Sequence, residues 1–403
     1  MAVGLEAPDR LHPVQGIRLA ATHCGIKANR TVKDLALLEI GAGASVAAVF
    51  TRSHFCAAPV SLCRQHLAHT QSSRYLLINS GNANAATGKT GLDNARACCR
   101  AVAEACAVDI EEVLPFSTGV IAEQLAVEPI VRAIPDLVGR LDSDGWLTAA
   151  EAIMTTDTLP KAISEQLMID NRPVTITGIA KGSGMIKPDM ATMLSYVATD
   201  ARIAQQELDE MLKQLVATSF NCITVDGDTS TNDSCVLIAT GATEVDVDRD
   251  HAPFFAALMR LFEQLAQAII RDAEGATKFV EITVAGAASE RDARLMAFTI
   301  AESPLVKTAL FASDPNWGRL IMAIGRSPVE QIDTDRIDLY LGSVRLLHQG
   351  LPDPDYRELL GQAEMSRAEI AIRVNLNLGD ARARVWTSDL SYEYVKINAE
   401  YRS

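Results

Sequence analysis

The sequence predicts a mixed α/β fold. Strand-like and helix-like segments alternate along the chain without a strict strand–helix–strand repeat, which favours a mixed architecture over a doubly wound parallel sheet. The chain has 403 residues, of which 48% are apolar, so it can form two domains or one large unit with a sizeable core. It contains no internal repeat, low-complexity block or obvious linker.

The first half of the chain is predicted to mix strands and helices. Residues 46–51 and 74–78 are β-like, and residues 92–107 form a helix because apolar positions recur at intervals of three and four. Residues 142–155 are helical up to a turn rich in hydroxyl groups. A further β-like run at 174–179 leads into a glycine-rich segment.

The second half begins with an apolar, strand-like stretch from Met193 to Val197. Two amphipathic helices follow at 204–219 and 253–272. Alternating apolar and polar residues then indicate half-buried strands. These predicted strands lie at 279–285, 337–341, 368–374 and 383–387.

Composition and charge exclude several classes of function. A net charge of −14 argues against sequence-independent nucleic-acid binding, which depends on Lys and Arg to neutralise phosphates. No stretch approaches the roughly 18 apolar residues of a membrane span, and residues 1–30 have no signal-like pattern. We therefore expect a cytoplasmic protein. The eight cysteines form no C-x-x-C pair and the seven histidines no H-x-x-x-H pair, so we predict reduced thiols and no metal.

The most informative segment is the run KGSGMIKPDMATML at 181–194. It places Thr192 after the small residue Ala191, behind a Gly- and Pro-containing approach. Cleavage between them would free an α-amine that titrates near neutrality and can act as the base for the Thr192 hydroxyl. The alternative is a glycine-rich turn that leads into a buried strand.

Several further motifs, spread over nearly the whole chain, accompany this run. They are NSGNANA at 79–85, STGVI at 117–121, MTTDT at 154–158, TVDGDTSTND at 224–233, EGATK at 274–278, DPNWGR at 314–319 and the ending from Tyr394 to Ser403. Together they resemble the signature of the ornithine acetyltransferase family, also called glutamate N-acetyltransferases. Two departures from that pattern are visible: Lys187 replaces a smaller or less basic residue, and Ala122 replaces a glycine.

The resemblance implies a self-cleaving enzyme with an N-terminal-nucleophile-like sandwich of helices and sheets that has its own topology. Two autoproteolytic fragments, residues 1–191 and 192–403, would build one composite fold. The resemblance also implies association of these alpha and beta fragments into a heterotetramer of two alpha and two beta chains.

Candidate site residues come partly from local chemistry. The turn Ser117-Thr118-Gly119 can offer a hydroxyl and a backbone N–H to an oxyanion, although an ordinary turn is the alternative. Lys181 could pair with a substrate carboxylate and Glu274 with an ammonium group.

The resemblance then assigns roles to these and other positions. Thr192 is the nucleophile, and Thr118 and Gly119 form the oxyanion hole. Substrate is bound by Thr155, Lys181, Thr192, Glu274, Asn398 and Ser403. Apolar and aromatic residues in the C-terminal tail indicate that it packs against the protein.

Two motifs invite other interpretations. Residues 226–233 resemble a calcium or magnesium loop but lack the EF-hand spacing and its closing Glu, so a polar loop that supports the site is favoured. Residues 83–90 fit a relaxed phosphate-binding loop, but they lack the first glycine and lie several residues beyond the preceding strand.

The function implied by the resemblance is transfer of acetyl from N2-acetylornithine to glutamate through an acetyl-threonine intermediate, in arginine biosynthesis. No cofactor is expected, and acetyl-CoA stays open as an alternative acetyl donor. The first rival is a self-processing aminopeptidase or amidase, in which water resolves the acyl-enzyme. The second is a non-catalytic binding or structural protein, whose chain would stay uncut.

Overall fold

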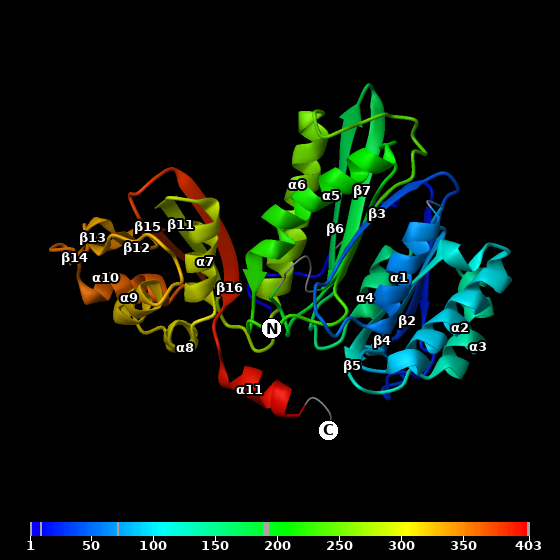
Figure 1. The fold of residues 1–403 in the computed structure, drawn as a ribbon, viewed down its shortest axis with the longest axis horizontal. Helices are drawn as coiled ribbons and strands as arrows, with labels where there is room; N and C mark the ends of the chain where they lie inside the picture. The colour runs from blue at the N-terminus through cyan, green and yellow to red at the C-terminus, as the bar shows by residue number, and fades with distance from the viewer. Residues whose placement is uncertain (1, 9, 71, 188–192, 401–403) are drawn as a thin grey trace.

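The computed structural model describes residues 2–8, 10–70, 72–187 and 193–400. These residues form three β-sheets with helices on their faces, so the predicted mixed α/β fold is confirmed. Figure 1 shows two bodies: a larger one that contains two of the sheets and a smaller one built around the third.

The first sheet has four strands in the order β1-β2-β4-β5. Its strands are β1 (Ile17–Thr22), β2 (Leu35–Ile40), β4 (Tyr75–Asn82) and β5 (Val113–Val120). One face of this sheet packs against helices α2 (Gly88–Cys106) and α3 (Val127–Gly139). Helix α1 (Ala58–His69) packs against β5 and α2.

The second sheet has five strands in the order β3-β10-β8-β7-β6. Its strands are β3 (Ser45–Phe50), β6 (Lys161–Ile169), β7 (Arg172–Lys181), β8 (Leu194–Thr199) and β10 (Ser234–Ala239). Helices α5 (Gln205–Thr218) and α6 (Ala252–Arg271) cover one face, where a large apolar cluster is buried.

The remaining faces of these two sheets share one core. Leu38, Leu76 and Phe116 of the first sheet belong to the same buried cluster as Tyr196 and Val236 of the second. Helix α4 (Trp146–Ile153) adds its buried side chains to this cluster. The larger body is therefore a helix–sheet–sheet–helix sandwich, as the layers in Figure 1 show.

The third sheet has seven strands in the order β14-β13-β12-β15-β11-β16-β9. They are β9 (Ile223–Thr224), β11 (Phe279–Ala287), β12 (Asp338–Leu341), β13 (Val344–His348), β14 (Leu351–Pro352), β15 (Glu369–Asn375) and β16 (Ala381–Ser388). The helices of this body are α7 (Glu290–Ala301), α8 (Pro304–Ala312), α9 (Trp317–Gly325) and α10 (Glu358–Met365). Its core is a separate cluster that runs from Val280 to Val385.

The predicted elements are present, with ends shifted by a few residues. The sequence did not predict the boundary near residue 278, beyond which the chain forms a body with its own core. Three short 3-10 helices, Ile110–Glu112, Phe220–Cys222 and Thr334–Arg336, complete the described structure along with the C-terminal helix α11 (Tyr392–Ala399).

Within the described residues, no single helix has the length and apolar character needed to cross a membrane, although the bent pair of α7 and α8 meets both criteria when taken together.

Candidate active site

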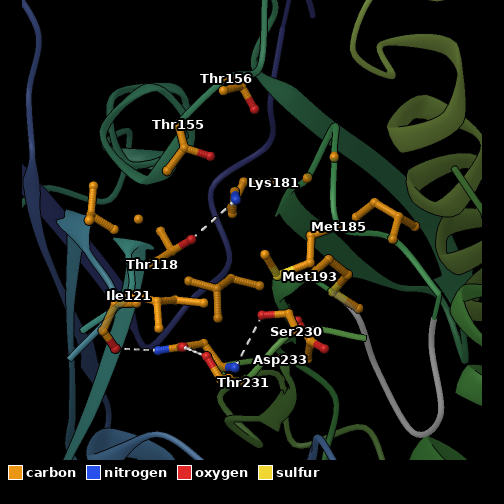
Figure 2. A pocket seen from close by; sticks show the side chains of 18 of the residues that line it. Thr118, Ile121, Thr155, Thr156, Lys181, Met185, Met193, Ser230, Thr231 and Asp233 are labelled. Carbon is orange, nitrogen blue, oxygen red and sulfur yellow. Dashed lines mark hydrogen bonds between the residues drawn. The ribbon is translucent and has the colours of Figure 1, made fainter. Parts of the chain in front are cut away.

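A cavity of about 270 Å³ lies where the two sheets of the larger body, the end of α6 and helix α11 meet. Of the site residues predicted from sequence, it brings together Thr118, Gly119, Thr155, Lys181, Glu274 and Asn398. They come from four separate stretches of the first 300 residues and from the C-terminal helix. Figure 2 shows Thr118, Thr155 and Lys181 on one side of this cavity and Met193, Ser230 and Asp233 on another.

Thr118 and Gly119 lie at the end of β5, beside a break in the regular pairing with β4. Asn82 of β4 is opposed there by both Thr118 and Val120. Gly119 has a φ of +133°, and a Cβ at this position would lie 2.3 Å from the carbonyl carbon of Gly81. Only glycine fits both this conformation and this contact, so the chain can bring a backbone N–H and a threonine hydroxyl to one place.

Lys181 is the last residue of β7, and its side chain is buried at the cavity wall. Its Nζ donates a hydrogen bond of 3.2 Å to Thr118 Oγ1, as Figure 2 shows. Burial lowers the pKa of Lys181, and Lys161 adds to this effect, whereas Asp157, Asp233 and Glu274 favour the charged form.

Thr155 is held in place by the buried carboxylate of Asp157. Asp157 accepts hydrogen bonds from the N–H of Thr155 at 2.9 Å, the N–H of Gly182 at 2.8 Å and Lys161 Nζ at 2.6 Å. Burial opposes its charge, but the ammonium groups of Lys161 and Lys181 lower the pKa of Asp157 well below its usual range. One carboxylate thus fixes both segments that carry Thr155 and Lys181.

Glu274 follows α6 and packs against Gly184, where any Cβ would lie 2.4 Å from the Glu274 carboxyl carbon. Its N–H donates to Ser183 O at 2.9 Å. Asn398 Nδ2 of α11 donates to Glu274 Oε2 at 2.7 Å. These contacts place a carboxylate at the cavity between the glycine-rich segment and the C-terminal helix.

The prediction that the tail packs through its apolar residues holds for part of α11. Tyr394 packs against the large apolar cluster next to α5 and α6, and the Tyr392 ring contacts the Phe311 ring edge to face. No residue of the helix is fully buried, however, and Val395 is 62% exposed. Hydrogen bonds also hold this segment: Ser391 Oγ donates to Gly275 O at 2.7 Å and Tyr394 OH to Asp226 Oδ2 at 3.1 Å.

The loop at 226–233 supports the site through side-chain hydrogen bonds. Asp226 accepts from the N–H groups of Met185 at 2.7 Å and Ile186 at 2.9 Å, so it anchors the glycine-rich segment. Asn232 Nδ2 donates to Ser117 O at 2.9 Å and thereby ties the loop to β5. Among the described residues, no group of three or more His, Cys, Asp or Glu side chains is arranged to hold a metal ion.

Asp233 is a cavity residue that sequence reasoning left without a role. Its side chain is buried, and its Oδ2 atom has no hydrogen-bond partner within the described part of the chain. Burial raises the pKa of Asp233 well above 3.8, against the opposing effects of Ser230 and Lys181. The sequence feature that could have identified Asp233 as a site residue is its place in the motif TSTND. The motif alone does not indicate which of its side chains enters the cavity.

Three predicted site residues, Ala191, Thr192 and Ser403, lie outside the described residues. Met193, which directly follows Thr192 in the chain, is buried and lines the cavity. Its carbonyl accepts a hydrogen bond of 2.9 Å from the N–H of Ser234. The first described residue after the predicted cleavage position therefore lies at the wall of the cavity that Asp233 also lines.

The two departures from the family pattern have identifiable environments. Lys187 Nζ forms an ion pair of 3.0 Å with Glu302 at the end of α7. Ala122 has a φ of +66°, in the left-handed region that glycine adopts most easily. A glycine would suit the backbone at position 122 better than the alanine present here.

The segment at 83–90 differs from a phosphate-binding loop. The side chain of Asn84 is buried within it, donating to Gly91 O at 2.9 Å and accepting from Thr87 Oγ1 at 2.8 Å. A phosphate-binding loop keeps its interior open for the anion and lines it with backbone amides.

Comparisons with known proteins agree over almost the full chain. The ArgJ family model matches residues 18–403. Two relatives carry the name arginine biosynthesis bifunctional protein ArgJ. The protein from Methylococcus capsulatus is 52% identical to this chain, and the match covers 98% of this chain and 97% of that protein. The protein from Pseudomonas syringae is 49% identical, and the match covers 100% of both chains. A crystal structure of ornithine acetyltransferase complexed with ornithine, from Mycobacterium tuberculosis, is 34% identical, covers 44% of this chain and 94% of that chain, and has a TM-score of 0.39.

Proposed function

The chain belongs to the ArgJ family, and from this premise we propose that Thr192 carries acetyl from N2-acetylornithine to glutamate. The protein is an enzyme of arginine biosynthesis that transfers acetyl groups. The observation that supports our choice of residues is the cavity in which Thr118, Gly119, Lys181 and Glu274 converge beside Met193, the residue after Thr192.

The reaction begins with self-cleavage between Ala191 and Thr192. The freed α-amine takes the proton of the Thr192 hydroxyl as its oxygen attacks the acetyl carbonyl. The carbonyl electrons move onto oxygen, and the Thr118 hydroxyl and the Gly119 N–H stabilise that oxyanion. The C–N bond then breaks, the amine returns the proton to the leaving ornithine, and acetyl stays on Thr192. Glutamate reverses these steps and leaves as N-acetylglutamate.

The charges of the cavity suit amino-acid substrates. Glu274 offers a carboxylate to the ornithine ammonium, and Lys181 supplies positive charge to the same cavity. Thr155, Asn398 and Ser403 complete the binding set. No cofactor is needed for this chemistry, since the nucleophile, base and oxyanion donors all come from the chain.

The test is to separate the two half-reactions. Enzyme incubated with N-acetylornithine alone should release ornithine in a burst no larger than the enzyme concentration. It should leave one acetyl mass on the fragment that begins at Thr192. Glutamate should then remove the label as N-acetylglutamate, with parallel lines when both substrates are varied. Thr192→Ala is the control and should give an uncut chain without a burst.

Two outcomes would contradict this mechanism. Intersecting kinetic lines without a trappable acetyl-enzyme would exclude the covalent intermediate. Steady release of acetate that glutamate does not change would instead assign the protein to the amidases.

Three finer points complete the proposal. Because the relatives are named bifunctional, acetyl-CoA is proposed as a second donor to Thr192, which would yield N-acetylglutamate directly from glutamate. Two alpha and two beta fragments are proposed to form a heterotetramer, which sedimentation equilibrium would measure. The reaction is placed in the cytoplasm, which fractionation of cells would test.

A further inference from the structure

The hydrogen bond between Lys181 and Thr118 gives the lysine a role other than holding a substrate carboxylate. Lys181 Nζ donates to Thr118 Oγ1 at 3.2 Å, and it is the one side-chain hydrogen bond found for this Nζ within the described residues. The two residues face one another across the cavity wall in Figure 2. This hydrogen bond uses one of the donors of the ammonium group, so Lys181 can orient Thr118 as well as supply positive charge to the cavity.

Because Lys181 donates this hydrogen bond, the Thr118 hydroxyl must donate its own proton to a different acceptor. An ammonium group has three donors and no acceptor, so Thr118 Oγ1 must be the acceptor of the pair. The hydroxyl proton of Thr118 therefore cannot point at Lys181 and is left for a partner elsewhere. Thr118 lines the cavity, so the cavity offers that partner.

Carboxylates face the buried ammonium group of Lys181. Burial has the largest effect on the pKa of Lys181 and lowers it, Lys161 lowers it further, and the charges of Asp157, Asp233 and Glu274 offset part of this shift. Asp157 also accepts from the N–H of Gly182, the next residue in the chain. The lysine is thus held at the end of β7 by a fixed backbone. A hydrogen bond from a charged donor is stronger than one between neutral groups, and it polarises the hydroxyl that accepts it.

We infer that Lys181 is a positioning residue of the oxyanion hole, which turns the Thr118 hydroxyl toward the cavity and strengthens its hydrogen bond to the reacting oxygen. In the transition state, the acetyl oxygen gains negative charge, Thr118 donates to it and Lys181 donates to Thr118. No proton leaves either side chain. The inference rests on the proposed function, because Thr118 is an oxyanion donor only if the protein forms a tetrahedral intermediate here.

A double-mutant cycle between Lys181 and Thr118 tests this inference. Thr118→Val should lower kcat about 10²-fold, the scale for loss of one oxyanion donor. Lys181→Met should lower kcat at least about tenfold, because Thr118 then loses its orientation, and any rise in KM from the lost positive charge should be smaller than this fall in kcat. Adding Lys181→Met to Thr118→Val should lower kcat less than about twofold further, since no hydroxyl remains to be oriented.

Two additional variants separate orientation from charge and from stability. Lys181→Gln keeps an N–H donor for Thr118 Oγ1 without the charge, so its kcat should lie between those of the wild type and Lys181→Met. Lys278→Met is the matched control, because Lys278 is also buried and its Nζ donates to Met365 O at 3.0 Å and Arg367 O at 2.9 Å, outside the cavity lining. It should lower the unfolding midpoint but leave kcat unchanged.

The outcomes distinguish failure of the inference from failure of the proposed function. If Lys181→Met raises KM more than about tenfold at constant kcat, the lysine binds substrate directly and the inference is wrong. Full additivity in the cycle has the same consequence. If Thr118→Val leaves kcat unchanged, the oxyanion hole itself is misassigned. If Lys181→Met does not fold, Lys181→Gln in both Thr118 backgrounds provides a cycle for the charge of the lysine, in which the loss of kcat should be smaller and should again depend on Thr118.

Discussion

At the scale of single residues, backbone conformation and sequence disagree at Ala122. Its φ of +66° lies in the left-handed region, which costs an ordinary residue about 1–2 kcal/mol. Ala122→Gly removes this strain but adds freedom to the unfolded chain, at a cost of roughly 0.5–1 kcal/mol. We predict a net gain of up to about 1 kcal/mol in the free energy of unfolding.

Urea unfolding of the two proteins measures this gain. Ala133→Gly, in the middle of α3, is the matched control and should destabilise the protein by about 1 kcal/mol, since glycine is disfavoured within helices. A loss of stability in Ala122→Gly of the same size as in the control would mean that the strain at Ala122 is not the deciding factor.

The buried carboxyl of Asp233 predicts a pH dependence of stability. Its folded-state pKa is raised above 3.8, so its contribution to stability is complete below that value and is lost as pH rises through the folded-state pKa. Asp233→Asn removes the titration. The variant should therefore gain stability relative to the wild type as pH rises from about 4, by up to about 1.4 kcal/mol per pH unit, until the folded-state pKa is passed.

Chemical unfolding at a series of pH values gives this difference directly. Comparing the two proteins at each pH cancels the titration of every other group, including Asp157, whose pKa is shifted in the opposite direction. A difference that stays constant with pH would show that Asp233 titrates alike in the folded and unfolded states.

At the scale of elements, helix α11 contributes to the cavity with only a small contribution to the core. None of its residues is fully buried, although Tyr394 packs against the apolar cluster next to α6. Side-chain hydrogen bonds join the helix to Asp226 and Glu274. We predict that deleting residues 392–403 shifts the unfolding midpoint by less than about 4 °C, the effect of roughly 1 kcal/mol in a chain of this size. It should raise KM at least tenfold, which is about 1.4 kcal/mol of lost binding.

Point variants show which part of the helix matters. Asn398→Ala should reproduce much of the rise in KM, whereas Val395→Ala, at a side chain that is 62% exposed, should behave as the wild type. Loss of folding in the deletion variant would mean that the tail is part of the core, as its aromatic residues first indicated.

The elements differ in how well the sequence predicts them. Periodicity identified α5 and α6 because each has one buried stripe and one exposed face. It did not identify β2, whose residues are nearly all buried and so show no alternation, or α7 to α9, which are short helices in a separate body. Packing on both faces removes the pattern on which such prediction depends.

The sequence likewise predicts some features of the candidate site and not others. The glycine at 119 and the charged residues at 181 and 274 could be selected from motifs and from a resemblance. The hydrogen bonds that define their roles could not, because Lys181 meets Thr118 across 63 residues and Asn398 meets Glu274 across 124. Such contacts depend on how distant strands and helices assemble, which local sequence does not encode.

At the scale of the whole molecule, the predicted cleavage position divides the chain between two paired strands of one sheet, β7 and β8. Residues 1–191 provide β3, β6 and β7 of the five-stranded sheet, and residues 192–403 provide β8 and β10. β8 pairs with β7 on one side and β10 on the other, and β10 pairs with β3. Neither fragment can complete this sheet or the cores on its two faces alone.

We therefore predict that self-cleavage leaves the molecule intact. The purified protein should give two bands on a denaturing gel, with a C-terminal fragment that begins Thr-Met-Leu-Ser, but one species on gel filtration. Residues 1–191 expressed alone should be unfolded or aggregated, because β7 would expose the edge that β8 covers and the faces of both sheets would lose apolar partners. Co-expression with residues 192–403 should restore a folded complex.

Thr192→Ala should stay a single chain and unfold cooperatively, because the sheet does not depend on the cut. Fragments that separate on gel filtration without denaturant would contradict a shared sheet, and a C-terminal fragment with any other first residue would place the cleavage elsewhere.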